Sequence, residues 1–360
     1  MRLLYHCPVG EGGLAEYGVH HATALAATAG GHAVVWMAPP GLAVPPGAEV
    51  FSDAKCPPPA PVGRLRRAVR FIRETLAVYR RLDAAIERVC PDAVLLSAWS
   101  EYLSPLWAWR LHRWRRRGVR FGAVIHDPIR DFVRGPGWFH RWSIREAYRF
   151  LEVVLTHDPT PPEVAGLRAG PTVATVPHGP YPVPTGSADA AEARRALGLP
   201  SGVKLALAFG HVRDGKNLDR VLAAMPLAPE WHLVVAGREQ SGGQRTMADY
   251  QQMAVEHGVA GRCHWFHEYV PNERIHLFFR ASDVLLLLYG TAFHSASGVL
   301  SLNAQFALPV IASGGDGPLR RAVIDYQLGS WLETLDPATL GASLQAGGPV
   351  PQWEAYLADH

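Results

Sequence analysis

The sequence predicts an α/β fold built from two doubly wound parallel sheets, and three observations support this prediction. Residues 2–6 and 33–37 are short apolar runs separated by a glycine-rich turn and a helical segment. The same alternation of buried strand and amphipathic helix begins again at residue 205 and continues to residue 312. Between the two runs, residues 177–186 are rich in proline and glycine, which is typical of a linker. The two halves of the chain are therefore expected to share one architecture.

The length of 360 residues suits two domains with substantial cores. We expect an N-terminal domain over residues 1–180 and a C-terminal domain over residues 181–335. A tail follows over residues 336–360 and could pack back on the N-terminal domain. The formal net charge of +3 and the 48% of hydrophobic residues are those of a globular protein.

The cysteine spacing and the apolar runs limit the class of protein. Four cysteines lie far apart without a C-x-x-C pair, so the sequence predicts neither a zinc site nor a disulfide framework. The first residues lack the long apolar segment of a signal peptide, and no other run approaches the ~20 residues of a membrane span. We expect a cytoplasmic protein that is soluble or peripheral on the inner face of the plasma membrane.

The first glycine-rich turn, over residues 8–13, follows the first strand and opens a helix over residues 14–28. Residues 10–13 spell G-x-G-G, which departs from the G-x-G-x-x-G pattern of dinucleotide-binding proteins. The second strand then runs into Ala38-Pro39-Pro40 and lacks the acidic residue that holds the ribose of NAD. This pattern argues against an NAD-dependent dehydrogenase.

A long amphipathic helix is predicted over residues 64–89, and we interpret its arginine-rich face as a solvated surface. After a strand over residues 93–96, the segment 105–120 combines tryptophan with arginine. The residues concerned are Trp107, Trp109 and Trp114 with Arg113, Arg115, Arg116 and Arg117. Such a segment favours contact with an anionic membrane surface. Nucleic acid is the less favoured partner, because no recognised binding motif accompanies the basic residues.

The strand predicted over residues 121–125 delivers His126 to its carboxyl end, and two further strands are predicted over 153–156 and 173–176. In an open α/β sheet, ligands bind at the carboxyl ends of the strands. A histidine there can donate or accept a hydrogen bond near neutral pH. A structural and a functional role for His126 both stay open on position alone.

Residues 204–220 carry the strongest chemical signal in the second half. A strand over 205–209 ends at Gly210, and a helix begins near Asn217. The turn between them carries Arg213 and Lys216, so two cations, free backbone N–H groups and a helix N-terminus converge. This combination predicts a phosphate-binding site, with a solvated turn as the structural alternative.

A P-loop of a nucleotide hydrolase is a second alternative for this turn, because residues 210–217 spell G-x-x-x-x-G-K-N. Asn217 stands where Ser or Thr would hold magnesium. The next strand, over residues 232–236, runs into Gly237-Arg238 instead of a metal-binding aspartate. Both departures argue against the P-loop interpretation.

The rest of the second half continues the alternation. Strands are predicted over residues 263–266, 283–288 and 309–312, and helices over residues 217–225, 246–257 and 272–280. A further helix begins at Ser297-Gly298 and ends near Phe306. The N-terminus of this helix offers a second set of free N–H groups for an anion.

Seven stretches, in their order and spacing, resemble retaining GT-B glycosyltransferases of glycosyltransferase family 4, also called glycosyl transferases group 1. They are GEGGLAEYG at 10–18, VIHDP at 124–128, VPHGPY at 176–181, FGHVRDGKNLDR at 209–220, LVVAG at 233–237, FHEYVPNERIHLFFRASDVLLLLY at 266–289 and SGVLSLNAQFALPVIAS at 297–313. The resemblance covers most of the chain. It implies two Rossmann-like domains that face each other across a cleft, the N-terminal one for an acceptor and the C-terminal one for a nucleotide-sugar donor.

The resemblance also implies roles for individual residues. Arg213 and Lys216 would hold the diphosphate of the donor, which Gly12 and Gly13 would approach from the other domain. His126 matches the family's catalytic-site histidine near the anomeric carbon, where it would orient the sugar or the acceptor. Backbone N–H groups for the donor would come from Ser297, Gly298 and Val299.

One departure from the family concerns two acidic residues near the helix that starts at Ser297. Many members carry Glu, seven residues and a second Glu, the first near the sugar and the second on the donor ribose. Alignment on Pro309 to Ile311 places His294 and Leu302 at these positions. This Ser-Gly-Val variant predicts an altered donor site that includes His294, or a lost activity.

The resemblance implies a hexosyltransferase that moves a hexose from a nucleoside-diphosphate sugar to a hydroxyl of a glycan or lipid-linked acceptor, with retention of configuration. No Asp-x-Asp occurs in the sequence, which is consistent with transfer that needs no metal ion. We expect no metal site, no cofactor besides the sugar donor, and no nucleic-acid partner. A noncatalytic GT-B-like protein that binds nucleotide sugars is the alternative, and the missing glutamates favour it.

Overall fold

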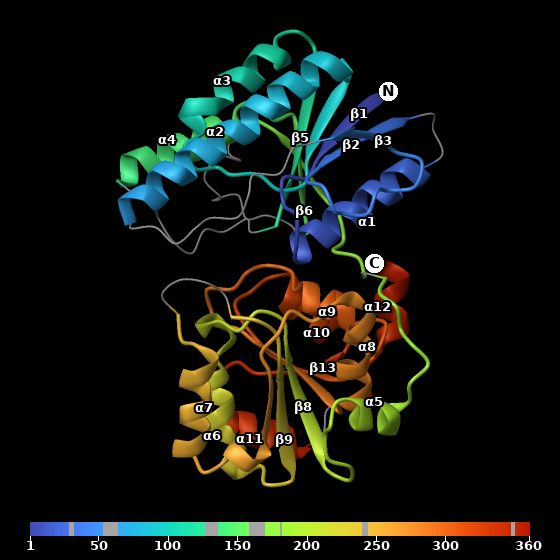
Figure 1. Cartoon of the computed structure of the whole chain (residues 1–360), viewed down its shortest axis with the longest axis vertical. Helices are drawn as coiled ribbons and strands as arrows, with labels where there is room; N and C mark the ends of the chain where they lie inside the picture. The colour runs from blue at the N-terminus through green and yellow to red at the C-terminus, as the bar shows by residue number, and fades with distance from the viewer. Residues whose placement is uncertain are drawn as a thin grey trace. The chain divides into compact units, whose positions relative to one another are not determined.

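The computed structural model describes residues 1–28, 32–52, 64–126, 136–157, 170–180, 182–239, 244–346 and 350–360. The chain divides into two compact units, Met1–Val176 and Pro177–His360 (Figure 1). The division falls four residues before the boundary that the linker composition predicts at residue 180. Each unit has its own parallel sheet with helices on both faces, as expected from the repeated alternation.

The first unit contains a parallel sheet of seven strands among the described residues, in the order β3-β2-β1-β4-β5-β6-β7. The chain moves outward from β1 to β3 and then returns to pair β4 with the free edge of β1. Such a reversal of strand order is where ligands bind in open α/β sheets. The strands are β1 (Arg2–His6), β2 (Ala33–Ala38), β3 (Glu49–Ser52), β4 (Ala93–Leu96), β5 (Arg120–Ile125), β6 (Val153–Thr156) and β7 (Thr172–Thr175).

The helices of the first unit cover the sheet according to the alternation of side chains along each strand. Leu4 of β1 joins a core with the buried faces of α2 (Arg64–Val89), α3 (Ser104–Arg115) and α4 (Gly137–Tyr148). Its neighbours Leu3 and Tyr5 point to the other face, where α1 (Gly13–Ala27) packs through Ala22. The predicted long helix over residues 64–89 is thus confirmed as α2.

Part of the segment 105–120 contacts α2. Trp107 is completely buried, with its ring stacked on Tyr79 at a centroid distance of 3.6 Å. The indole N–H of Trp114 donates to Oδ1 of Asp83 at 2.7 Å. Arg110 and Arg113 donate to the same carboxylate at 3.0 and 2.8 Å. Of the three tryptophans, Trp109 alone is exposed, whereas Arg115, Arg116 and Arg117 at the end of the segment are all exposed.

The second unit repeats the architecture with a described sheet in the order β10-β9-β8-β11-β12-β13. The order reverses between β8 and β11, which places the switch point at the predicted phosphate-binding turn. The strands are β8 (Lys204–Phe209), β9 (Trp231–Ala236), β10 (Cys263–Phe266), β11 (Val284–Leu288), β12 (Val310–Ser313) and β13 (Gly329–Trp331).

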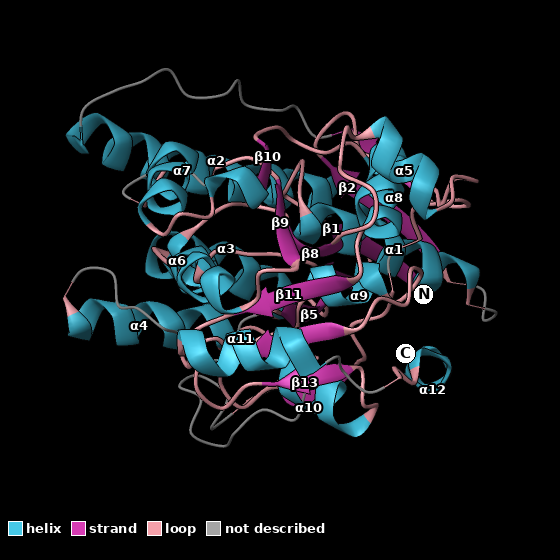
Figure 2. Ribbon diagram, turned by 90° about the horizontal axis from the view of Figure 1, so that it is seen from below, coloured by secondary structure: helices cyan, strands magenta, loops and turns pink. Residues whose placement is uncertain are grey.

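The helices of the second unit form two layers on this sheet (Figure 2). One layer consists of α6 (Leu218–Ala224), α7 (Met247–Glu256) and α11 (Pro337–Ala346), with the short helices η1 (Asp214–Lys216), η2 (Met225–Leu227) and η3 (Ala260–Arg262) nearby. The other consists of α5 (Ala190–Ala196), α8 (Asn272–Ala281), α9 (Gly298–Asn303), α10 (Pro318–Asp325) and α12 (Trp353–Asp359).

The C-terminal tail belongs to the second unit. Tyr356 of α12 is buried, and its ring lies edge-on to Tyr326 at 5.4 Å. The hydroxyl of Tyr326 also donates to Asp359 at 2.7 Å. No helix in the described part of the chain is both long and apolar enough to cross a membrane.

Candidate functional site

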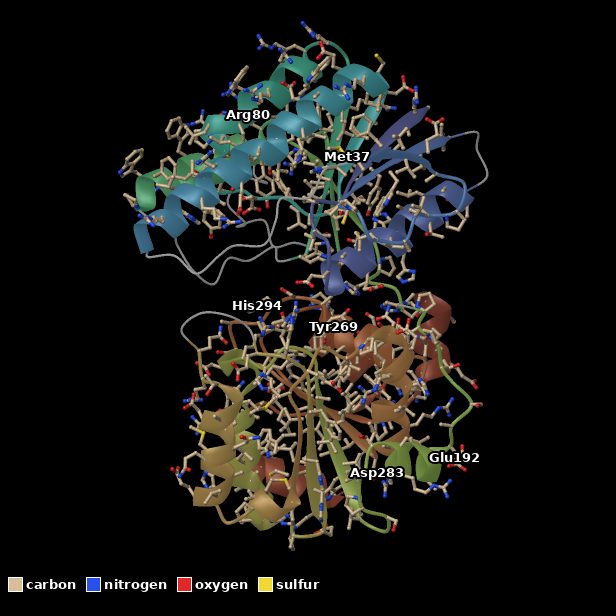
Figure 3. All side chains as sticks on the ribbon, in the orientation of Figure 1. Met37, Arg80, Glu192, Tyr269, Asp283 and His294 are labelled. Atoms are coloured by element: carbon tan, nitrogen blue, oxygen red, sulfur yellow. The ribbon has the colours of Figure 1, made fainter. Side chains whose placement is uncertain are left out.

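The carboxyl ends of β8, β9, β11 and β12 lie at one edge of the second sheet, because these strands are parallel and paired in register. The residues that follow them are Gly210, Gly237, Tyr289 and Gly314. This edge collects every donor-site residue that the sequence predicts in the second unit, from Arg213 to Val299. Figure 3 labels His294 at the same edge of the unit.

Gly210 brings two distant parts of the chain together. Its φ of +87° is a backbone conformation that glycine adopts without strain. A Cβ atom at this position would lie 3.2 Å from Nζ of Lys216 and 3.7 Å from Cγ2 of Val299. Lys216 and Val299 are therefore neighbours across Gly210, as expected if both serve one ligand.

The ammonium group of Lys216 is buried. Its Nζ donates to the backbone carbonyl of Phe209, the last residue of β8. Burial and, to a lesser extent, the charge of nearby Arg213 together lower the pKa of Lys216 to about 7. A carbonyl oxygen cannot neutralise an ammonium group, so an anion bound here would stabilise the charged form.

Arg213 immediately precedes η1 and is half-buried. Within the described residues, neither Arg213 nor Lys216 has a carboxylate within ion-pair distance. Two cations held close together without an acidic partner repel each other, and this repulsion is relieved by a bound anion. Burial does not lower the pKa of a lysine that is fully solvated. The lowered pKa of Lys216 therefore argues against the solvated-turn interpretation.

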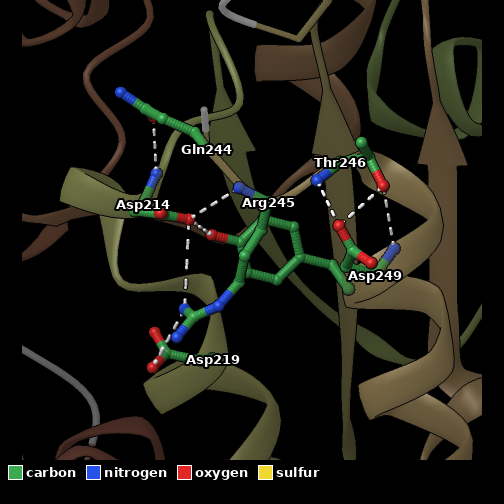
Figure 4. A network of polar contacts seen from close by, with 7 residues as sticks. Asp214, Asp219, Gln244, Arg245, Thr246 and Asp249 are labelled. Atoms are coloured by element: carbon green, nitrogen blue, oxygen red, sulfur yellow. Dashed lines mark hydrogen bonds and ion pairs between the residues drawn. The ribbon is translucent and has the colours of Figure 1, made fainter. Parts of the chain in front are cut away.

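Asp214, the acidic residue in the turn, forms hydrogen bonds with residues near the start of α7, as Figure 4 shows. Oδ1 of Asp214 accepts hydrogen bonds from the hydroxyl of Tyr250 at 3.0 Å and from the backbone N–H of Arg245 at 3.2 Å. The backbone N–H of Asp214 donates to the side chain of Gln244 at 2.9 Å. Arg245 also pairs with Asp219 at 3.4 Å. This network fixes the turn to the start of α7 and occupies the carboxylate of Asp214.

The Asp214 network could not be predicted from local sequence, because the partners of Asp214 lie 30 or more positions away along the chain. Asn217, which follows η1, stands where a P-loop would carry the Ser or Thr that holds magnesium. Its φ is +50°, and its side-chain N–H donates to the carbonyl of Leu288 at 3.1 Å. The amide therefore connects the turn to the end of β11.

Ser297, Gly298 and Val299 begin α9 at the same edge. The Ser297 hydroxyl is buried and accepts a hydrogen bond from the backbone N–H of Leu300 at 3.4 Å. The same hydroxyl lies 3.3 Å from the hydroxyl of Tyr289, whose ring stacks on Phe293. The first N–H groups of a helix have no acceptor within the helix. Those of Gly298 and Val299 are thus available beside Lys216.

His294 and Leu302 occupy the positions where the family resemblance predicts glutamates. Nδ1 of His294 donates to the carbonyl of Asp316 at 2.7 Å, which leaves Nε2 as the second polar atom of the ring. A Cβ on Gly315 would lie 2.5 Å from Cε1 of His294, so the loop after β12 packs directly on this ring. Leu302, in contrast, is buried in the core. Position 294 thus keeps a polar side chain, whereas position 302 contributes to the hydrophobic core.

In the first unit, Gly12 and His126 lie after β1 and β5, at the carboxyl edge of that sheet. Gly12 has a φ of +83° and caps α1, while Gly13 is its first residue. A Cβ on either glycine would have no neighbour within 4 Å among the residues that the structure describes. The positive φ requires glycine at position 12, whereas the open space around Gly13 leaves room for an approaching group.

His126 is held by hydrogen bonds within the first unit. Its Nε2 lies 2.9 Å from the carbonyl oxygen of Ser97, and its Nδ1 lies 3.1 Å from Nε2 of His157. The ring of Tyr17 packs edge-on against both histidines, at 4.7 and 5.1 Å. His157 was not singled out in the sequence. His157 directly follows β6, just as His126 directly follows the neighbouring strand β5. This shared position at the strand end is the signal by which the sequence could have indicated His157. Residues Asp127 and Pro128 of the VIHDP stretch lie outside the described residues.

Part of the second unit is similar to a known protein family. Residues 189–346 match the family model described as glycosyl transferases group 1. D-inositol 3-phosphate glycosyltransferase of Mycolicibacterium gilvum is 28% identical over 218 residues, which are 56% of this chain and 46% of that protein. The enzyme of the same description from Thermomonospora curvata is 30% identical over 181 residues, or 48% of this chain and 41% of that protein. The chain thus spans under half the length of these relatives.

Solved structures similar to the whole chain share its fold. Sucrose-phosphate synthase from Thermosynechococcus elongatus has a TM-score of 0.67 at 19% identity, covering 96% of this chain and 88% of that one. HepE of Anabaena, in complex with UDP and glucose, also has a TM-score of 0.67, at 14% identity, covering 96% and 89%. The two parallel-sheet units and these similarities confirm the GT-B class, with two Rossmann-like domains.

Proposed function

We propose that this protein, whose second unit contains a group 1 glycosyltransferase domain, moves a hexose from a nucleoside-diphosphate sugar to a hydroxyl of a glycan or lipid-linked acceptor. The observation that carries the proposal is the pair of cations Arg213 and Lys216, which lie at the switch point of the second sheet without an acidic partner among the described residues. A diphosphate supplies the charge that this pair lacks.

In this proposal, charged side chains and backbone N–H groups bind the donor. Lys216 and Arg213 contact the diphosphate, and the N–H groups of Gly298 and Val299 donate to it from the start of α9. Ser297 keeps its structural hydrogen bonds and fixes this helix start. His294 contributes Nε2 toward the sugar or the ribose, because its Nδ1 is engaged by Asp316. HepE, with a similar fold, is bound to UDP and glucose in its solved structure.

The reaction breaks the bond between the anomeric carbon and the diphosphate oxygen and forms a bond to the acceptor oxygen. The nucleoside diphosphate leaves with the electron pair, and the acceptor hydroxyl loses its proton. Negative charge therefore develops on the leaving phosphate, where fixed cations stabilise the transition state. Two side-chain cations can do this without a metal ion, and we propose a metal-independent reaction with retention of configuration and no cofactor besides the donor.

The first unit is proposed to bind the acceptor, with His126 orienting the reacting groups and the loop at Gly12 and Gly13 approaching the diphosphate. A cytoplasmic location with peripheral attachment to an anionic membrane surface accompanies this proposal, and no nucleic-acid partner is proposed. Exposed aromatic side chains on α3 and α4 support the membrane contact: Trp109 is 51% exposed, Trp138 63% and Trp142 47%. Trp138 and Trp142 stack on each other, and α4 packs against α3.

A noncatalytic protein that binds nucleotide sugars is the second candidate. The observation that favours it is Leu302, which is packed into the core at a position where many family members carry a donor-binding glutamate. This candidate predicts nucleotide binding without release of the sugar.

The test combines binding and turnover. Thermal unfolding is measured with UDP, GDP, ADP and their hexose conjugates, with and without EDTA, because a ligand that binds only the folded protein raises its apparent stability. We expect one nucleotide family to stabilise the protein in EDTA, and its hexose conjugate to be consumed when acceptors are supplied. Stabilisation without any sugar release across acceptors and water would favour the binding protein. Dependence of binding on magnesium would contradict the proposed site.

A further inference from the structure

Tyr250 of α7 contacts the turn that carries Arg213 and Lys216. Its side chain is completely buried, and its hydroxyl donates to Oδ1 of Asp214 at 3.0 Å. Burial raises the pKa of Tyr250 to about 12, so the hydroxyl keeps its hydrogen at neutral pH. Asp214 lies between the two cations in the sequence and 36 residues before Tyr250. A buried side chain of α7 is thus connected directly to the proposed phosphate-binding turn.

The two ends of this turn are attached to the sheet. On one side, the backbone N–H of Val212 donates to the carbonyl of Arg238, just after β9, at 2.9 Å. On the other side, the side-chain N–H of Asn217 donates to the carbonyl of Leu288 at the end of β11. Between these two points, Asp214 attaches the middle of the turn to α7.

Hydrogen bonds hold the carboxylate of Asp214 more firmly than charge does. Besides the Tyr250 hydroxyl, Oδ1 accepts the backbone N–H of Arg245 at 3.2 Å. The guanidinium of Arg245 lies 4.0 Å from this oxygen and closer, at 3.4 Å, to Asp219. The side chains of Arg245 and Asp214 are 39% and 45% exposed, and ion pairs between exposed groups contribute little. Asparagine at position 214 should therefore keep the contact with Tyr250, whereas alanine should lose it.

We propose that Tyr250 and Asp214 are positioning residues for the donor diphosphate, because the hydrogen bond between them holds the turn in the conformation that directs Arg213 and Lys216 to one ligand. Both residues act through the two cations and do not touch the donor. The inference rests on the proposed function, since the diphosphate is the ligand proposed for this turn. Without the hydrogen bond, only a fraction of the molecules should hold both cations in place, and the apparent affinity falls by that fraction.

The ionisation of Lys216 indicates the conformation of the turn in the absence of any ligand. Burial is the main reason why its pKa is about 7 and not 10.5, and the charge of Arg213 is the second. If the turn opens, water reaches the ammonium group and the pKa rises. The sequence contains only three lysines, Lys55, Lys204 and Lys216. A ¹³C NMR spectrum of protein labelled at lysine Cε therefore has few signals, and K216A assigns the relevant one.

The first test is this titration in the full-length protein without ligand. We expect Lys216 to titrate near pH 7 in the wild type and about one unit or more higher in Y250F and D214A. D214N should titrate within about half a unit of the wild type. Loss of the carboxylate charge cannot itself raise the pKa of a lysine, because a negative charge favours the ammonium form. A variant whose Lys216 titrates as in the wild type would overturn the role of the residue that it replaces.

Asp249 provides the matched control, because it stabilises the start of α7 through a separate contact (Figure 4). Its side chain accepts from the backbone N–H and the hydroxyl of Thr246 at 2.6 and 2.8 Å. D249A should therefore destabilise the protein in urea but leave the titration of Lys216 unchanged. A shift in D249A as large as in D214A would mean that any loosening of α7 opens the turn. That result would overturn the specific role of the hydrogen bond between Tyr250 and Asp214.

The second test measures the Kd of whichever of UDP, GDP and ADP stabilises the wild type. We expect Y250F and D214A to raise this Kd about fivefold or more, and D214N and D249A to stay within about twofold of the wild type. If no nucleotide binds the wild type while the titration of Lys216 shifts as expected, the proposed function fails and the hydrogen bond still positions the turn. If Y250F and D214A bind the nucleotide as tightly as the wild type, the positioning role fails and the proposed function stands.

Discussion

Arg213 and Lys216 lie close enough for the charge of the arginine to lower the pKa of the lysine, although no carboxylate among the described residues balances either of them. Proteins rarely keep two adjacent cations unpaired unless a ligand completes the charge, because the repulsion is otherwise uncompensated. This relationship is the basis of the donor site, and the first two predictions follow from it.

Removal of either cation should weaken sugar transfer. R213A and K216A are each expected to lower kcat/KM for the donor at least tenfold, since a charge-assisted contact contributes about 1.5–3 kcal/mol. Steady-state kinetics with the donor identified by thermal unfolding measure the effect. R220A is the matched control, because Arg220 is an exposed arginine on α6, four residues beyond Lys216. Unchanged kinetics in both site variants would contradict the assignment of the diphosphate site.

Donor affinity should depend on pH through Lys216. The pKa of this lysine falls from 10.5 to about 7 in the free protein, so the ammonium form is progressively lost above pH 7. A bound diphosphate favours the ammonium form and raises the pKa, so binding above pH 7 should take up a proton. We expect the donor Kd to rise by up to about tenfold per pH unit above 7, until the pKa of the complex is reached.

Calorimetry in two buffers of different ionisation enthalpy measures this proton uptake at pH 8. The uptake should disappear in K216A and persist in R220A. Binding that is independent of pH between 7 and 9 in the wild type would show that Lys216 does not face the diphosphate.

The contact between the turns after β8 and β9 should be sensitive to a single methyl group. A Cβ on Gly237 would lie 2.1 Å from the carbonyl oxygen of Gly210, and the φ of Gly237 is +150°. G237A should therefore lower the free energy of unfolding by at least about 2 kcal/mol, as measured by urea denaturation. Gly261 serves as the control, since a Cβ there has no neighbour within 4 Å. A stable G237A variant would mean that the two turns separate easily.

Asp83 should be important for the stability of the first unit. Its carboxylate accepts from Trp114, Arg110 and Arg113 and is only 12% exposed. D83A leaves these three donors without their acceptor and should cost about 2–3 kcal/mol of unfolding free energy. E87A, at an exposed position one turn further along α2, should cost less than about 0.5 kcal/mol. Equal small effects would mean that water replaces the carboxylate without loss.

Membrane attachment should depend on the exposed tryptophans of α4 and not on the buried Trp107. The protein should float with anionic vesicles at low salt, and high salt should release it because ionic screening weakens the contact. The double variant of Trp138→Ser and Trp142→Ser should reduce the bound fraction severalfold. V255S is the control, because Val255 is exposed by 60% but lies on α7 in the other unit. Failure of the wild type to float at low salt would contradict the peripheral attachment.

The strands and most helices could be predicted from sequence because their signals are local. Apolar runs such as residues 205–209 and 284–288 are buried from end to end, and a glycine or a change of polarity ends each one. The turn with Arg213 and Lys216 was recognised for the same reason, since both cations lie within seven residues of the strand end.

Features that depend on distant partners could not be predicted. The pattern of residues 105–120 resembled a membrane-binding surface, but Asp83 lies about 30 positions earlier and turns Trp114 and two arginines inward. His157 became relevant only when the pairing of β5 and β6 placed it beside His126. Asp214 is a further example, because the first of its hydrogen-bond partners in that network, Gln244, lies 30 residues later in the chain.

The close approach of Gly237 to Gly210 also affects how new donor specificities can arise. Because the carbonyl of one turn fills the space where a side chain of the other would be, the two loops cannot vary independently. A recombinant protein that takes the 237–239 segment from a relative with a side chain at the position of Gly237 would have to take the 210–217 segment from the same parent. Chimeras that separate such segments should fail to fold, even when each segment is functional in its own parent.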